Sequence, residues 1–430
     1  MRRLTRILGI AAAAAPVFAS ALPAQTIAIT GGRVFPVSGA PIEDGTVIIQ
    51  DGRIAAVGAN VPVPAGAQRI DASGKWVTPG LINPATQLGL IEVGQVGETR
   101  DASARGRGDA INASFTPWLG LNPASVLLAP AREMGVTSVV VLPSGGLISG
   151  QAALIDLLSD TSVSAMLRRA PIAMVAQTSN PGAAQTSAQG ELLIKLRELL
   201  DDTRAYAQRR ADYERGATRD LIARRIDLEA MIPVVRGALP IIVNADSRVD
   251  IESALDLARE YELRLIIGGG TDAWQVADRL ATARVPVMTG AINNIPGFSS
   301  LGIRQDNAAL LRRAGVDVLL VGTGSDPLTF NVRNITQEAG NAVSYGMEWN
   351  EALRAITLAP AEVFGVADRV GSLQPGRDAN VVVWSGDPFE FATRAEQVFI
   401  RGVAQPLGES RQDQLTERYR RLPPDYRGTP

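Results

Sequence analysis

The side chains that could do chemistry in this chain are carboxylates and amides, because its 430 residues include no histidine and no cysteine. The absence of these two residue types excludes thiolate and imidazole metal ligands. It also excludes Ser-His-Asp and Cys-His catalytic systems. Lysine occurs only at Lys75 and Lys195. Ser73 and Lys75 lack the spacing of a Ser-x-x-Lys nucleophile. What remains is the chemistry of oxygen ligands and of carboxyl groups.

Several carboxylates follow predicted strands, at the face where barrel enzymes build their sites. A metal site made only of oxygen ligands therefore stays open. Solvated loop charges are the commoner explanation, and no spacing singles out a pair for acid-base work. Asn331 and Arg333 come shortly after the last of these carboxylates and could form a polar pocket wall, although loop hydrogen bonding by Asn explains them equally well. The carboxylates are Glu92, Glu98, Asp101, Asp246, Asp272 and Asp326.

Two glycine-rich stretches, residues 142–151 and 268–274, could hold an anion at a helix N-terminus. Neither has the spacing of a phosphate-binding loop. We therefore favour tight strand-to-helix turns at both places.

The elements that must position these groups alternate between short Val- and Ile-rich runs and helical patterns, which is typical of parallel strands with crossover helices. Residues 250–262 and 272–280 have the helical spacing. The strand runs are 81–88, 136–142, 172–177, 240–245, 263–269, 286–291 and 316–322. This number approaches the eight strands of a TIM barrel, and a doubly wound open sheet is the structural alternative.

Both ends of the chain differ from this middle, because they contain short β-prone runs. Asp51-Gly52 lies between two such runs and predicts a hairpin. Similar runs return at 379–384 and 397–402. We expect residues 22–78 and 366–430 to form one small β-sandwich with a C-terminal tail, around a barrel at 79–365.

Within that barrel, residues 190–235 are predicted to form a long Arg-rich helical insertion. The simplest interpretation is a solvated amphipathic helix packed on the barrel, and a lid or partner surface is the alternative.

The first residues resemble a secretion signal: three arginines precede an apolar run and Ala19-Ser20-Ala21. We expect residues 1–21 to be removed and the mature protein to be periplasmic or secreted, with no membrane span. The alternative, a buried or membrane-anchoring helix, has an apolar run shorter than the ~20 residues that span a bilayer. With 42 basic and 44 acidic residues and no basic stripe, nucleic-acid binding is not expected.

Three segments together resemble the amidohydrolase superfamily in its imidazolonepropionase-like branch. They are KWVTPGLINPATQLGL, EALRAITLAPAEVFGVADRVGSL and RVGSLQPGRDANVVVWSGDPFE. The resemblance implies an α/β fold, a distorted TIM (β/α)8 barrel with a small β-sandwich built from both termini. It also implies hydrolysis of non-peptide C–N bonds in small or cyclic amides by one or two divalent metals.

The family's metal ligands are replaced in this sequence. Its first-strand His-x-His falls on Ala85 and Gln87, with Asn83 in place of the preceding aspartate. Its strand-five histidine falls on Asn244, and its strand-six histidine falls at or beside Gly269. Zinc hydrolases need about three protein ligands, mostly imidazole, so these replacements argue against a zinc site.

The surviving family residue is Asp326, which matches the strand-eight aspartate that takes a proton from the metal-bound water. Two functions follow. The first is a degenerate amidohydrolase that binds a small molecule or pairs with another copy or a related subunit. The second is an active hydrolase with an oxygen-ligand site rebuilt around Asp326. No cofactor is expected, and a divalent metal is expected only if oxygen ligands replace histidine.

Asp326 is the candidate catalytic residue. The candidate substrate-binding residues are Gln87, Asn244, Asp246, Asn331 and Arg333. A third interpretation gives residues 89–109 and the long helix a role only in assembly.

Overall fold

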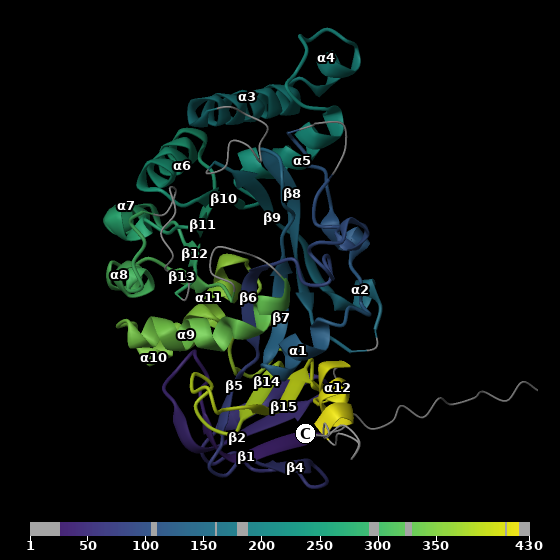
Figure 1. Cartoon of the computed structure of the whole chain (residues 1–430), viewed down its shortest axis with the longest axis vertical. Helices are drawn as coiled ribbons and strands as arrows, with labels where there is room; N and C mark the ends of the chain where they lie inside the picture. Colours follow the sequence, from purple (N-terminus) through teal and green to yellow (C-terminus); the bar gives the residue numbers. More distant parts are fainter. Residues whose placement is uncertain are drawn as a thin grey trace, which may run out of the picture.

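Two eight-stranded sheets dominate the computed structural model (Figure 1). It describes residues 26–104, 110–159, 161–178, 188–291, 301–322, 329–408 and 411–420. The first sheet has the order β13-β12-β11-β10-β9-β8-β7-β6, and its end strands β6 and β13 contact each other, so it forms a nearly closed barrel. Its strands are β6 (Leu81–Thr86), β7 (Val136–Val141), β8 (Ile148–Asp156), β9 (Leu167–Gln177), β10 (Ile241–Ala245), β11 (Leu265–Gly269), β12 (Val287–Thr289) and β13 (Val318–Leu320). The predicted TIM-like barrel is confirmed, and all seven predicted strand runs lie in it.

The eighth strand was not predicted. β8 pairs antiparallel with both β7 and β9, whereas the other neighbouring pairs in this sheet are parallel. The prediction of a strand-to-helix turn over residues 142–151 is therefore wrong, because this segment reverses the chain from β7 into β8. Gly145 and Gly146, with φ of 85° and 76°, supply the left-handed backbone for that reversal.

Helices cover the outside of the barrel (Figure 1). The predicted helix over 250–262 is α6 (Arg248–Tyr261), which begins after Ser247, whose hydroxyl accepts the N–H of Asp250 at 3.2 Å. The predicted pattern over 272–280 becomes a 3₁₀ turn, Ala273–Val276, followed by α7 (Ala277–Ala283). The other helices here are α8 (Asn307–Arg313), α9 (Ile335–Ser344), α10 (Trp349–Ala355) and α11 (Leu358–Val363), with the short α1 (Leu128–Glu133) and α2 (Val163–Met166) nearer β7 and β9.

The barrel interior is apolar. One buried cluster joins the inward side chains of the strands, among them Val175, Ile242 and Ile266, to residues of and just after α11, including Ala361 and Phe364. On β8 its members Ala152 and Leu154 alternate with Ala153 and Ile155 of the outer cluster, as expected of a strand buried on both faces. β6 and β9 depart from this alternation, because Ile82 and Ala85 are three residues apart and Ile172 and Ala173 are adjacent.

The second sheet contains strands from both ends of the chain, in the order β16-β15-β14-β5-β1-β2-β3, with β4 paired to β1. The strands are β1 (Ile27–Val34), β2 (Ile42–Gln50), β3 (Arg53–Gly58), β4 (Gln68–Asp71), β5 (Trp76–Pro79), β14 (Val381–Trp384), β15 (Ala395–Ile400) and β16 (Val403–Ala404). The predicted hairpin at Asp51-Gly52 is confirmed, with both residues at positive φ between β2 and β3. The predicted signal segment, residues 1–21, lies outside the described residues. After the sheet comes α12 (Arg411–Arg420).

A buried ionic network connects the two sheets. Asp156 of β8 is fully buried and accepts hydrogen bonds from Ser138, from Arg168 at 2.6 and 3.0 Å, and from Arg401 at 2.7 Å. Arg168 also donates to Asp378, at 2.6 Å. Because Arg401 and Asp378 belong to the terminal part of the chain, these bonds fix its position on the barrel.

The predicted helix over 190–235 is three helices, not one. They are α3 (Gln189–Gln208), α4 (Arg210–Glu214) and α5 (Arg225–Val235), and α3 packs on α5 at the end of the molecule drawn at the top of Figure 1. The chain turns back between them because the buried Asp202 accepts hydrogen bonds from Arg219 and from the backbone N–H of Ile222. Among the described residues, no helix combines the length and the hydropathy required to cross a bilayer.

Candidate functional site

The mouth of the barrel, at the carboxyl ends of its strands, is lined by amides on two neighbouring strands. Val175 and Ile242 belong to the interior cluster, so the residues two positions further on, Gln177 and Asn244, also point inward. Gln177 and Asn244 are direct partners in the parallel pairing of β9 and β10, and both are half-buried. Gly268 is the partner of Asn244 on β11.

The missing side chain at Gly268 gives Asn244 its position. A Cβ at residue 268 would lie 2.3 Å from Asn244 Oδ1, so the carboxamide occupies space that only glycine leaves. The backbone oxygen of Asn244 accepts hydrogen bonds from the N–H and the hydroxyl of Thr178, at 3.2 and 3.1 Å. These bonds hold the end of β10 against the end of β9.

A third amide, Gln87, comes directly after β6, at the start of a turn. Ala85, near the end of β6, belongs to the interior cluster. Gln87 is 5% exposed, and its side chain forms no hydrogen bond among the described residues. Asn83 has a structural role instead: its Oδ1 accepts the N–H of Ala85 at 3.2 Å, and its Nδ2 lies 3.5 Å from the carbonyl of Val332.

Three carboxyls gather beside this mouth. Asp246 follows β10 and accepts the hydroxyl of Thr271 at 2.7 Å, while Asp250 and Asp272 are buried nearby. Burial raises the pKa of Asp246, and the charges of Asp250 and Asp272 add to the rise, which the Thr271 hydrogen bonds only partly offset. Burial likewise raises the pKa of Asp272.

The other predicted site residues are dispersed. Asp326 lies outside the described residues, so its prediction stays untested. Asn331 and Arg333 lie on the 3₁₀ segment Thr329–Asn334, where Arg333 is exposed and Asn331 accepts a long hydrogen bond from Asn334. Glu98 and Asp101 are exposed in the loop after β6. In that loop Glu92 accepts the side chain of Asn122 at 3.1 Å.

The donor set at the mouth does not fit the family's metal. The positions predicted for histidine carry a methyl group at Ala85, amides at Gln87 and Asn244, and no side chain at Gly269. Within the described ranges, no three His, Cys, Asp or Glu side chains are grouped so that they could hold an ion. Neutral amides are weak zinc ligands beside imidazole or thiolate, so these side chains support no catalytic step through a metal.

Gln177 was missed by the sequence reasoning. Its signal was present, because Gln177 is two residues beyond Val175 in the predicted strand 172–177. Without the pairing of β9 and β10, nothing in the sequence places it beside Asn244. The stretch 268–274 leads from β11 into a 3₁₀ turn, as the turn interpretation requires.

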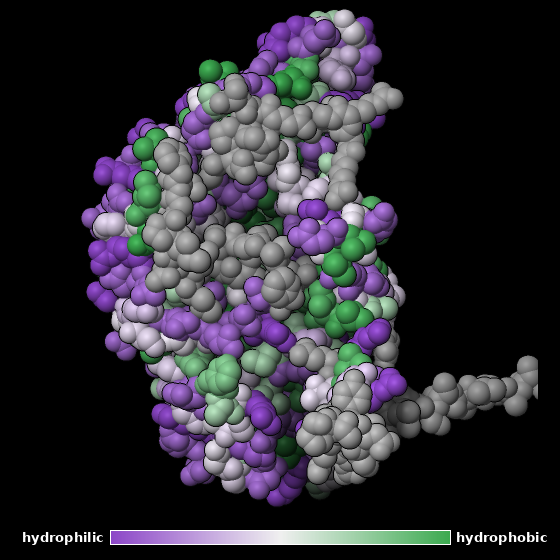
Figure 2. Space-filling model, viewed as in Figure 1, coloured by the Kyte–Doolittle hydropathy of each residue, from purple (hydrophilic) through white to green (hydrophobic). Residues whose placement is uncertain are grey.

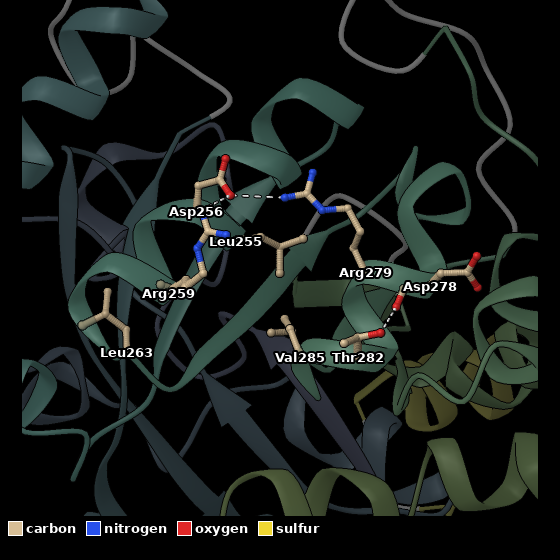
Figure 3. A pocket seen from close by; sticks show the side chains of 10 residues that line it. Leu255, Asp256, Arg259, Leu263, Asp278, Arg279, Thr282 and Val285 are labelled. Atoms are coloured by element: carbon tan, nitrogen blue, oxygen red, sulfur yellow. Dashed lines mark hydrogen bonds and ion pairs between the residues drawn. The ribbon is translucent and has the colours of Figure 1, made fainter.

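A cavity of about 590 Å³ lies elsewhere, on the outer surface between α6 and α7 (Figure 3). Leu255 and Val285 belong to its apolar wall, while Arg259 and Arg279 both pair with Asp256 at its rim. Figure 2 shows hydrophobic atoms between hydrophilic ones along the edge of the molecule where α6 and α7 lie. This groove is on the helix layer, away from the strand ends, and it contains none of the predicted site residues.

Comparison with known proteins agrees with the architecture. The sequence model of the amidohydrolase family matches residues 248–405. Amidohydrolase tasK of Hapsidospora irregularis is 25% identical over 402 residues, which cover 84% of this chain and 40% of that protein. An imidazolonepropionase of Acidiphilium cryptum is 25% identical over 371 residues, covering 81% of this chain and 89% of the enzyme.

A solved structure extends this likeness to nearly the whole fold. The crystal structure of an amidohydrolase from Thermotoga maritima has a TM-score of 0.80 at 26% identity, and the match covers 89% of this chain and 100% of that one. The fold and the matches define an amidohydrolase-type barrel with a sheet built from both termini. This chain is similar to amidohydrolases in the sequence of residues 248–405 and in its fold. It spans less than half the length of the fungal relative and most of the length of the other two proteins.

Proposed function

We propose that this chain is an exported member of the amidohydrolase superfamily that no longer carries out metal-dependent hydrolysis and instead binds a small molecule at the barrel mouth. The observation that carries the proposal is the donor set. Asn244 and Gln87 replace imidazoles with neutral amides, and Ala85 and Gly269 offer no ligand atom. The barrel fold is retained.

The chemical argument concerns the nucleophile. A metal hydrolase holds its ion by about three ligands and lowers the pKa of a bound water to about 7. Without such ligands that water keeps its ordinary acidity. The described carboxyls beside the mouth do not replace this function, because no three of them are grouped so that they could hold an ion. A mouth lined by amides is suited to recognition by hydrogen bonds.

Metal content decides between this proposal and a hydrolase rebuilt around Asp326. The mature protein, purified with a non-histidine tag and dialysed against trace divalent ions, is measured by elemental mass spectrometry. Wild type and Asp326→Ala should both hold far less than one ion per chain. The control is Asp368→Ala, since Asp368 is exposed. Near-stoichiometric Mg, Ca, Mn or Zn that disappears only in Asp326→Ala would contradict the proposal and favour an active hydrolase.

The cellular place and the partners are part of the same proposal. The arginines and the apolar run before Ala21 support cleavage there and a periplasmic or secreted protein. Sequencing the N-terminus of the exported protein tests this, and an intact Met1 would contradict it. Pairing with another copy or a related subunit is the remaining part of the proposal. Light scattering of the purified protein measures whether two copies of this chain pair.

A further inference from the structure

The groove between α6 and α7 continues into a second cavity on the outside of the barrel. The first cavity has a volume of about 590 Å³ and the second about 400 Å³, and Leu263, Ala283 and Val285 line both. Pro240 and Pro286, which directly precede β10 and β12, line only the second cavity. The combined cavity, here called the outer groove, therefore extends from the helix layer to the amino ends of the strands, away from the barrel mouth.

The floor of the outer groove is aliphatic. Leu255, Ala258 and Val285 are each 7–8% exposed, and none of the residues that line the two cavities is aromatic. Cavities of about 300–1,000 Å³ with apolar walls and a few polar groups are typical of small-molecule sites. An elongated groove with aliphatic walls is suited to an alkyl chain, which it would remove from water.

The rim of the first cavity is formed by arginines that share their partners. Arg259 and Arg279 each donate one hydrogen bond to the same oxygen, Asp256 Oδ1, at 3.3 and 3.2 Å (Figure 3). Arg279 also lies 3.2 Å from Glu252, a carboxylate that Arg248 shares. Each guanidinium has five N–H donors, so donors and positive charge remain for an incoming anion.

The other acidic residues of the outer groove do not cancel this charge. The Asp278 carboxylate points away from the cavity in Figure 3. Asp317 and Glu362 both pair with Arg354, which is not a lining residue. Arg284 is exposed beside the second cavity and forms no ion pair with any described residue. The outer groove therefore favours an anionic ligand over a cationic one.

We infer that the outer groove binds an alkyl chain that carries one anionic head group, with a fatty-acid carboxylate as the simplest example. The chain lies along Leu255 and Val285, and the head group pairs with Arg259 and Arg279. Asp256 occupies the place of that head group between the two guanidinium groups, so it competes with the ligand. This site is separate from the barrel mouth and does not depend on the proposed function.

Three probes separate the contributions of the chain and the head group. Butanoate keeps the carboxylate of octanoate on a shorter chain, and octylammonium keeps the chain with the opposite charge. Saturation-transfer NMR titrations below the micelle concentration give the Kd of each probe. Octanoate should bind at least about tenfold more tightly than butanoate, because each buried methylene strengthens binding up to about fourfold. It should also bind about fivefold more tightly than octylammonium.

Two variants of the rim should change octanoate binding in opposite directions. Arg259→Gln should raise the Kd about threefold, because it removes one exposed guanidinium. Asp256→Asn should lower the Kd about threefold, because it removes the competing carboxylate, whereas damage to the fold would weaken binding. The control Arg215→Gln should change nothing, since Arg215 forms the same i,i+3 pair with an aspartate on α4.

A third variant fills the outer groove. Ala283 is exposed and lines both cavities, so the ring of Ala283→Phe should occupy the groove and abolish octanoate binding. Ala205→Phe is the matched control at an exposed position of α3. Thermal melts of all variants show which of them remain folded.

Three results would overturn the assignment of the outer groove. They are absent octanoate binding, octylammonium binding as tight as that of octanoate, and an unchanged octanoate Kd in folded Ala283→Phe. The last result would mean that octanoate binds elsewhere on the protein. The proposed function survives all three results, because it concerns the barrel mouth and its metal content.

Discussion

Replacing Asp156 by Asn tests the ionic network between the barrel and the terminal sheet. Asp156 has no solvent exposure, and its carboxylate receives donors from two guanidinium groups and one hydroxyl. Asn keeps the shape but brings an N–H₂ group against those donors. It also leaves Arg168, whose side chain is 7% exposed, with Asp378 as its only remaining ionic partner in the network.

The expected loss follows from that geometry. Removing one partner from a buried ion pair costs about 3–5 kcal/mol, and the lower end applies here because Asp378 still neutralises Arg168 and Arg401 is partly exposed. We expect Asp156→Asn to lower the free energy of unfolding by about 3 kcal/mol, measured by urea denaturation at pH 7. The control Asp368→Asn changes an exposed carboxylate and should stay within about 0.5 kcal/mol of wild type. A loss below about 1 kcal/mol for Asp156→Asn would show that this network does not hold the two sheets together.

Three further outcomes follow from the structure. Burial alone would raise the pKa of Asp378, but hydrogen bonds from Arg168 and Arg369 lower it below the usual value. Ionised Asp378 therefore stabilises the fold above about pH 4, and this stabilisation disappears as pH falls through the folded pKa. The free energy of unfolding of Asp378→Asn should lack this acid-dependent decrease. Gly135→Ala should cost about 2–4 kcal/mol in urea unfolding, because its φ is 76° and a Cβ would lie 2.3 Å from the ring of the buried Trp384. Asp246→Asn should raise stability at pH 7, because the raised pKa of Asp246 means that ionisation disfavours the fold, and the advantage should shrink as pH falls toward 4.

Each of these outcomes has a control or a contrary result. Gly74→Ala shares the positive φ of Gly135 but meets no atom within 4 Å, so it measures backbone strain alone. Equal losses in the two glycine variants would remove the Trp384 contact as a cause. An Asp246→Asn protein that is less stable than wild type at pH 7 would show that ionised Asp246 stabilises the fold. An acid titration of Asp378→Asn that parallels wild type would show that Asp378 contributes nothing to acid unfolding.

The fold could be predicted where each element carries its own signal. Parallel strands buried on both faces appear as continuous Val and Ile runs, and this identified β7 and β10. β8 was missed because it begins with Ile148-Ser149-Gly150, which resembles a turn. Gly150 is required there for another reason: a Cβ would lie 2.7 Å from the carbonyl of Phe115, a contact between segments far apart in sequence.

The site shows the same division between local and long-range information. Motif matching predicted Asn244 and Gln87 as site residues, and strand alternation gives the direction of Asn244 on β10. The neighbour of Asn244 depends on the register of β9 against β10, which is set by packing across some 65 residues. The long segment 190–235 was misjudged for a similar reason, because buried Asp202 folds the chain back through partners about 20 residues away.

Zinc binding by equilibrium dialysis shows whether the barrel mouth has lost its metal site. The measurement compares wild type with a variant in which Ala85→His, Gln87→His and Asn244→His restore the imidazoles on the same frame. We expect wild type to bind zinc no better than the buffer blank, while the restored variant retains up to one ion per chain. Wild type that retains one zinc per chain at micromolar free metal would contradict the proposal that this barrel has lost its metal chemistry.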